Sequence, residues 1–197
     1  MSPDISKALS LVDAAHSEDP NKITPPGSKV EVPYELHYAQ KMSSYLDKLS
    51  PSASINLKIA IRAQHFRRWE VPRSSYPMTK LGYHQWRGYL KKRQAELVSQ
   101  VLADCGFSEG DRSRVEALIR KEGLKEGDEE AQTLEDVACL VFLDDQFEEF
   151  KDKHDETKIV DILRKTWVKM SKTGQDTALD MHMDEESRRL VEKAISG

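Results

Sequence analysis

The sequence has few cysteines and no long apolar run, and each absence excludes a class of protein. Cys105 and Cys139 are its only cysteines, too few for a disulfide framework or a cysteine zinc site. No stretch approaches the roughly 20 apolar residues that cross a bilayer, so we expect no membrane segment. The beginning of the chain lacks a basic leader and a small-residue cleavage site. We therefore expect no secretory signal and a cytoplasmic location.

An excess of positive charge is also missing. The chain has 30 Lys and Arg against 34 Asp and Glu, a formal net charge of -4. This balance argues against broad electrostatic capture of nucleic acid. With 197 residues, the chain is long enough for one domain with a continuous core, and we expect a single domain over residues 1–197. The oligomeric state stays open.

Apolar residues recur at helical spacing along most of the chain, with Gly and Pro between the periodic stretches and no convincing strand alternation. The pattern predicts an all-α, single-domain helical bundle. Residues 17–32 are expected to form a polar, Pro-rich loop, and prolines interrupt residues 70–80. We expect helices at residues 3–16 (capped by Ser2), 33–49, 51–69, 81–103, 108–121, 129–153, 156–171 and 184–197.

Polar side chains interrupt two of the most apolar expected helices. Gln64 and His65 follow the aliphatic part of 57–69, and Glu135 and Asp136 begin the hydrophobic part of 129–153. Buried polar groups must be paired, hydrogen-bonded or bound to metal, so we predict a polar site between these helices. In one interpretation His65 and Asp136 bind a divalent metal (Mn, Fe, Zn or Mg) that activates water for attack on phosphorus. In the other, His65 hydrogen-bonds to Asp136 or Glu135 and joins the two helices.

Arginines alternate with aromatic residues after His65 and along the following helix. Guanidinium groups bind phosphate through two parallel hydrogen bonds, and Trp or Tyr can stack on a base. This pattern predicts a pocket for a nucleotide or another phosphorylated metabolite. The alternative is that the aromatics belong to the core and the basic groups pair with carboxylates. The candidate ligand-binding residues are Gln64, Arg68, Trp69, Arg73, Tyr76, Trp86, Arg87, Lys165 and Lys169.

Four segments in order, AQHFRRWEVPRSSYP, GYHQWRGYLKK, QTLEDVACLVFL and ILRKTWVKMS, resemble the family catalogued as domain of unknown function 4202. The resemblance covers nearly the whole chain and implies no activity. A more distant resemblance is to HD-domain phosphohydrolases, whose helical bundle gathers His and Asp ligands around divalent metal. ELHYAQKM, LKIAIRAQHF and EEAQTLEDVACLVFL follow their order and hydrophobic pattern.

The HD resemblance implies an HD-like architecture with His37, His65 and Asp136 as metal ligands. The chain departs from that pattern at Phe66, where the paired Asp should stand, and at Gln94, where relatives often have His. The candidate catalytic residues are Glu135, Asp136 and Lys121.

Three functions remain open. The first is a degenerate HD-type, metal-dependent phosphohydrolase that acts on a nucleotide or phosphorylated metabolite. The second is a non-catalytic ligand-binding or regulatory protein on an eroded scaffold of the same kind. The third is a tRNA-linked role, because residues 169–173 (KMSKT) resemble the KMSKS loop of class I tRNA synthetases. That motif has no HIGH-like partner and no glycine-rich strand-to-helix turn here.

Overall fold

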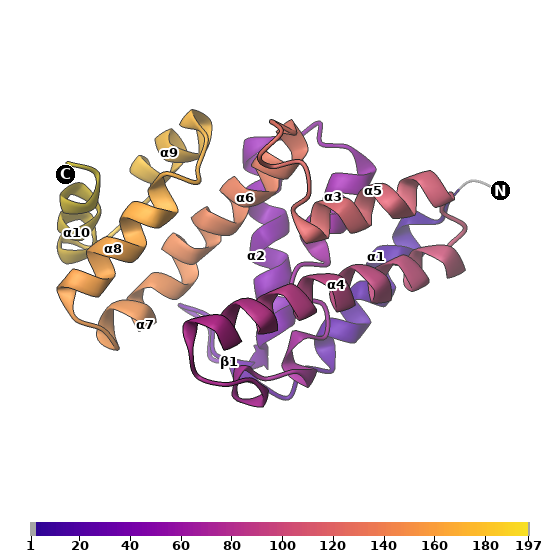
Figure 1. The fold of residues 1–197 in the computed structure, drawn as a ribbon, viewed down its shortest axis with the longest axis horizontal. Coiled ribbons are helices and arrows are strands. Elements are labelled where there is room, and N and C mark those ends of the chain that lie inside the picture. The colour runs from indigo at the N-terminus through magenta and orange to yellow at the C-terminus, as the bar shows by residue number, and fades with distance from the viewer. Residues whose placement is uncertain (1–2, 197) are drawn as a thin grey trace.

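The computed structural model describes residues 3–196, which form ten α-helices and one short antiparallel β pair (Figure 1). The predicted all-α class is confirmed. Along the chain the elements are α1 (Ile5–Ser17), β1 (Lys22–Ile23), β2 (Val32–Pro33), α2 (Tyr34–Leu49), α3 (Ile55–Arg62), the 3-10 turns Arg68–Glu70 and Arg73–Ser75, α4 (Lys80–Asp104), α5 (Glu109–Arg120), α6 (Glu129–Val141), the π-helical segment Phe142–Gln146, α7 (Phe147–Asp152), α8 (Glu156–Trp167), α9 (Lys172–Leu179) and α10 (Glu185–Ile195).

Side-chain caps set the beginnings of several helices. Ser54 accepts a hydrogen bond from the backbone N–H of Leu57, so α3 begins four residues later than the predicted start at residue 51. Asp4 caps α1 by accepting from the N–H of Lys7. The predicted cap at Ser2 lies outside the described residues.

The centre of the molecule is built on α2 and α6, which pack against each other (Figure 1). Met42 and Leu46 of α2, together with Leu134 and Leu140 of α6, are almost completely buried. Each such side chain contributes about 1.5–3 kcal/mol of hydrophobic free energy. Helices α1, α3, α4 and α5 lie on one side of this centre, and α8, α9 and α10 lie on the other. The two groups meet around the cavity described below.

Three predicted helices differ from the observed ones. The helix expected over 51–69 ends at Arg62, because the chain then turns through left-handed conformations. The helix expected over 129–153 contains a π-helical segment, Phe142–Gln146, between α6 and α7. The helix expected over 156–171 stops at Trp167, and the separate helix α9 was not predicted. No helix within residues 3–196 combines the length and the apolar character of a membrane span.

Candidate functional site

The turn after α3 places the first residues of the site. His65 and Arg67 have φ values of 65° and 50°, in the left-handed region that non-glycine residues rarely adopt. Between them Phe66 is only 3% exposed and packs in the core. The position at which the HD resemblance would require an aspartate is thus occupied by a core residue. Such backbone strain persists only where surrounding packing holds it, and it is commonly found at functional sites.

His65 is held between an aromatic ring and a guanidinium group. Its ring stacks on that of Tyr38 with centroids 4.1 Å apart and planes 13° apart. Its Nε2 lies 2.7 Å from Nη1 of Arg68. Because a guanidinium can only donate, Nε2 is the acceptor and the ring proton sits on Nδ1. Burial, with the nearby charges of Arg68 and Arg87, lowers the pKa of His65 well below its ordinary value.

Arg68 is a mostly buried cation without a carboxylate. Its guanidinium lies 4.8 Å from the centroid of the Trp86 ring and donates to His65, but within residues 3–196 it has no ion-pair partner. Burial, and then the charge of Arg87, lowers the pKa of Arg68. An arginine so placed lacks the anion that normally compensates its desolvation.

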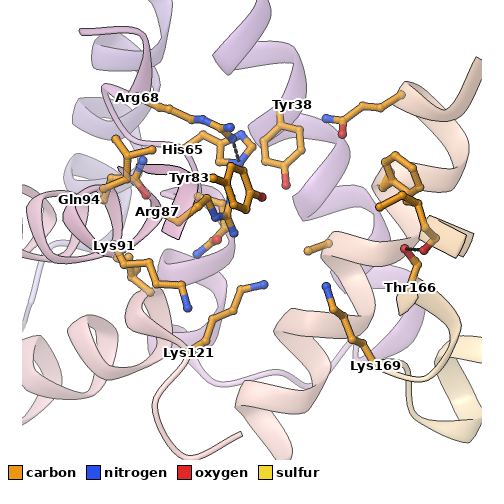
Figure 2. A pocket seen from close by; sticks show the side chains of 17 residues that line it. Tyr38, His65, Arg68, Tyr83, Arg87, Lys91, Gln94, Lys121, Thr166 and Lys169 are labelled. Atoms are coloured by element: carbon orange, nitrogen blue, oxygen red, sulfur yellow. Dashed lines mark hydrogen bonds between the residues drawn. The ribbon is translucent and has the colours of Figure 1, made fainter. Parts of the chain in front are cut away.

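These residues line a cavity of about 340 Å³ where α2, α4, α6 and α8 meet. Figure 2 shows Lys91, Lys121 and Lys169 directing their amino groups toward the space that Arg68 and Arg87 also reach. We call this space the cationic cavity, defined by these five basic residues. Burial and the neighbouring charges of Lys121 and Arg87 lower the pKa of Lys91, as expected for cations crowded together.

Among the described residues, Glu135 is the carboxylate that pairs with cations of this cavity. With Glu122 and Glu126 it lines an adjoining hollow of about 620 Å³, which shares Arg87, Lys91, Lys121 and Lys169 with the cationic cavity. Glu135 is ion-paired to Lys121, and Nζ of Lys169 lies 3.9 Å from its other oxygen. Although burial opposes its ionisation, these ammonium groups hold the pKa of Glu135 below its ordinary value. Two predicted catalytic residues, Glu135 and Lys121, therefore do lie together at this site.

Asp136, on α6, points away from this site and contacts the N-terminus of α9. Its Oδ1 accepts from the backbone N–H of Ser171 and from Nε2 of Gln132, each at 2.8 Å, and its Oδ2 accepts from the Ser171 hydroxyl. It lines a separate hollow with Ser171 and Thr173. His65 and Asp136 therefore do not meet in one site as predicted, because His65 lines the cationic cavity and Asp136 lines the separate hollow. Adjacent helix residues project about 100° apart, so Glu135 points instead toward the lysines of the adjoining hollow.

The predicted metal ligands do not converge. Nε2 of His37 is 2.6 Å from Oδ1 of Asp145, so its partner is neither His65 nor Asp136. Within residues 3–196 no group of three or more His, Cys, Asp or Glu side chains could hold a metal ion. The residues present therefore do not fit the divalent metal that the HD resemblance implied.

The predicted ligand-binding residues fall into three groups: those that line the cationic cavity, those that line a neighbouring cavity, and those that line neither. Gln64 and Arg87 line the cationic cavity with Arg68 and Lys169, whereas Trp69, Arg73 and Trp86 line a neighbouring cavity. Tyr76 packs near Tyr89, with ring centroids 6.3 Å apart. Lys165 is exposed, pairs with Asp161 at 2.5 Å and lines neither cavity.

Sequence reasoning missed Tyr38 and Gln146 as cavity residues. Tyr38 directly follows His37 on α2. An aromatic residue at a buried helical position is ordinary in a core, so the sequence gives no indication that Tyr38 lines a ligand site. Gln146 ends the π-helical segment, and it donates to the Tyr34 hydroxyl at 2.8 Å. A π-helical segment cannot be recognised from the spacing of apolar residues in the sequence. Such segments often occur at functional sites.

The KMSKT segment is mostly structural. Met170 is buried, Ser171 caps α9 and binds Asp136, and Lys172 pairs with Asp176 on the surface. Of its five residues, Lys169 alone lines the cationic cavity. The segment therefore contributes one ammonium group to the site.

Comparisons with known proteins identify the family without naming an activity. No curated protein and no solved structure matches the chain. A family model described as "Domain of unknown function (DUF4202)" matches residues 6–191, which is nearly the whole chain. The chain therefore belongs to the DUF4202 family.

Proposed function

We propose that this protein binds a phosphorylated small molecule in the cationic cavity, as a ligand-binding protein. The observation that carries the proposal is Arg68, a largely buried guanidinium that has no carboxylate partner among the described residues. A phosphoryl group would supply the missing negative charge and accept the remaining guanidinium hydrogens.

The balance of charge around the cavity supports the same ligand class. Among the described residues, five basic side chains and no Asp or Glu line the cationic cavity. The adjoining hollow adds three carboxylates, those of Glu122, Glu126 and Glu135. The excess of basic side chains in the cationic cavity is unusual in a chain whose formal net charge is -4. A cavity of about 340 Å³ lies in the size range of small-molecule sites, so it favours a compact anion over a nucleic acid.

The phosphohydrolase and tRNA-linked alternatives receive less support. Metal-dependent hydrolysis would need ligands to a divalent ion, and His37 and Asp136 are engaged by Asp145 and Ser171 instead. A tRNA-linked role rested on KMSKT, of which Lys169 alone reaches the cavity. Binding of a phosphorylated ligand, by contrast, needs only the basic side chains that line the cationic cavity.

Calorimetric titration with pyrophosphate, at constant ionic strength, tests the proposal. Wild-type protein is expected to bind, and Arg68→Gln to bind on the order of 10- to 100-fold more weakly, because charge-assisted hydrogen bonds are lost. Lys165→Gln is the matched control, since it removes a cation that lies outside the cavity. Unchanged affinity in a folded Arg68→Gln variant, or no binding of either pyrophosphate or a nucleoside diphosphate by the wild type, would contradict the proposal.

A further inference from the structure

A second cavity adjoins the cationic one. It has a volume of about 570 Å³, and its walls include the rings of Tyr34, Trp69 and Trp86. We call it the aromatic cavity, defined by these three rings. His65, Arg68 and Gln146 line both cavities, so the two spaces meet at these side chains.

The walls of the aromatic cavity are held in place by hydrogen bonds. The indole N–H of Trp86 donates to the carbonyl of Val71 at 2.9 Å, and the backbone N–H of Trp69 donates to Oε1 of Glu35 at 2.8 Å. The Tyr34 hydroxyl accepts from Gln146. The Trp86 ring and the Tyr34 hydroxyl are thus held directly, and Trp69 is held through its backbone. Walls held in this way need little further ordering to receive a planar group, which reduces the entropic cost of binding.

Unpaired donors cluster around the two cavities. Five buried side-chain polar atoms within residues 3–196 have no hydrogen-bond partner, and three of them belong to residues that line these spaces: Nδ1 of His65, Nε1 of Trp69 and Nε2 of Gln94. All three are nitrogen atoms that donate hydrogen. A buried donor without an acceptor is costly, so their concentration here points to a ligand that carries acceptor atoms.

Arg68 joins the two environments. Its guanidinium faces the Trp86 ring at 4.8 Å, and the same side chain lines the cationic cavity. A ligand with an anionic end in the cationic cavity would therefore pass this arginine to place an aromatic end beside Trp69 and Trp86. Phosphate esters of heteroaromatic compounds combine these two ends with ring acceptors.

We propose that one nucleotide spans both cavities, with its phosphates among the cations and its base in the aromatic cavity. This inference rests on the proposed function and specifies its ligand class. Trp69 would contribute ring contact and its unpaired N–H to an acceptor on the base. Arg68 would contact the phosphate end.

The test compares ligands that have the same number of phosphates. ADP, GDP, UDP and CDP are titrated against pyrophosphate by calorimetry at constant ionic strength. At least one nucleoside diphosphate is expected to bind 10-fold or more tightly than pyrophosphate, because base stacking on aromatic residues contributes strongly to binding. If pyrophosphate binds and no nucleoside diphosphate exceeds it, the nucleotide inference is wrong while the proposed function stands. If neither kind of compound binds, both proposals are wrong.

A pair of tryptophan variants locates the base. Trp69→Phe keeps an aromatic ring and removes the N–H, so the ratio of nucleotide to pyrophosphate affinity is expected to fall several-fold. Trp167→Phe is the matched control, because Trp167 lines a different pocket with Leu163 and Met170. Nucleotide is also expected to quench tryptophan fluorescence less in Trp69→Phe than in Trp167→Phe. A preserved ratio in Trp69→Phe, or quenching lost only in Trp167→Phe, would overturn the assignment.

Discussion

Arg68 donates a hydrogen bond to Nε2 of His65 across 2.7 Å, and this one contact determines the protonation state of His65. It requires a neutral imidazole, because a protonated ring would have no lone pair to accept it. The guanidinium itself has no carboxylate partner among the described residues, so its charge is not compensated. His65 is therefore neutral and Arg68 is cationic, and both residues line the two cavities.

The lowered pKa of His65 predicts a loss of stability at acid pH. As pH falls through about 6.5, His65 gains a proton in the unfolded chain but stays neutral in the folded one. The free energy of unfolding should then fall by at most about 1.4 kcal/mol per pH unit, down to the lower folded-state pKa. Urea denaturation between pH 5 and 7.5 measures this slope.

His65→Asn should reduce that slope, since Asn tolerates the left-handed conformation and does not titrate. His84→Asn, at an exposed position, serves as the control and should keep the wild-type slope. Identical slopes in wild type and His65→Asn would show that His65 titrates normally.

Glu135→Gln should strengthen anion binding. Glu135 neutralises Lys121 and approaches Lys169, so removing its charge leaves these ammonium groups available to a ligand. We expect pyrophosphate affinity to rise about 3- to 10-fold and the free energy of unfolding to fall by about 1–3 kcal/mol, through loss of a charged hydrogen bond. Calorimetry and urea denaturation measure the two effects.

The control for that variant is Glu149→Gln, whose carboxylate forms an exposed pair with Lys153. It should change neither quantity appreciably. Weaker pyrophosphate binding in Glu135→Gln would mean that Glu135 orients the lysines for the ligand and does not compete with it.

Two glycine variants test the contact between α6 and α9. A Cβ atom at Gly174 would lie 2.8 Å from Cγ of Asp136, so Gly174→Ala should displace α9 and lower the free energy of unfolding by about 1–3 kcal/mol. Gly88 lies on an exposed part of α4 with nothing within 4 Å of an added Cβ. Gly88→Ala should therefore raise stability by about 0.5–1 kcal/mol. Thermal unfolding measures both changes in stability, which are expected to have opposite signs. A Gly174→Ala variant more stable than wild type would contradict the packing of α9 on Asp136.

Removal of divalent metal should leave the protein unchanged. His37 and Asp136 already have partners, and the described residues offer no group of three ligands. Treatment with a chelator is expected to shift the melting temperature by less than about 1 °C, since a bound metal would stabilise the folded state. A near-stoichiometric metal that disappears in His65→Asn would contradict this expectation.

Local sequence patterns predicted the all-α class and the approximate limits of most helices. Apolar periodicity located α2, with Met42 and Leu46 on its buried face, because a helix buries one continuous stripe. The left-handed turn at His65 and Arg67 could not be predicted in this way. Neither residue favours that conformation alone, and it forms where packing of Phe66 and stacking on Tyr38 compensate its cost.

The amino-acid sequence by itself determined most of the helical segments and that polar groups would be buried at Gln64, His65, Glu135 and Asp136. The tertiary structure decided how those groups are paired. A buried carboxylate accepts from whichever donors the packed helices bring to it: Asp136 binds Ser171, and Glu135 binds Lys121. Such pairings join residues far apart in the chain, so local sequence patterns cannot predict them. The cluster of cations around Arg68 likewise forms only when the helices pack together.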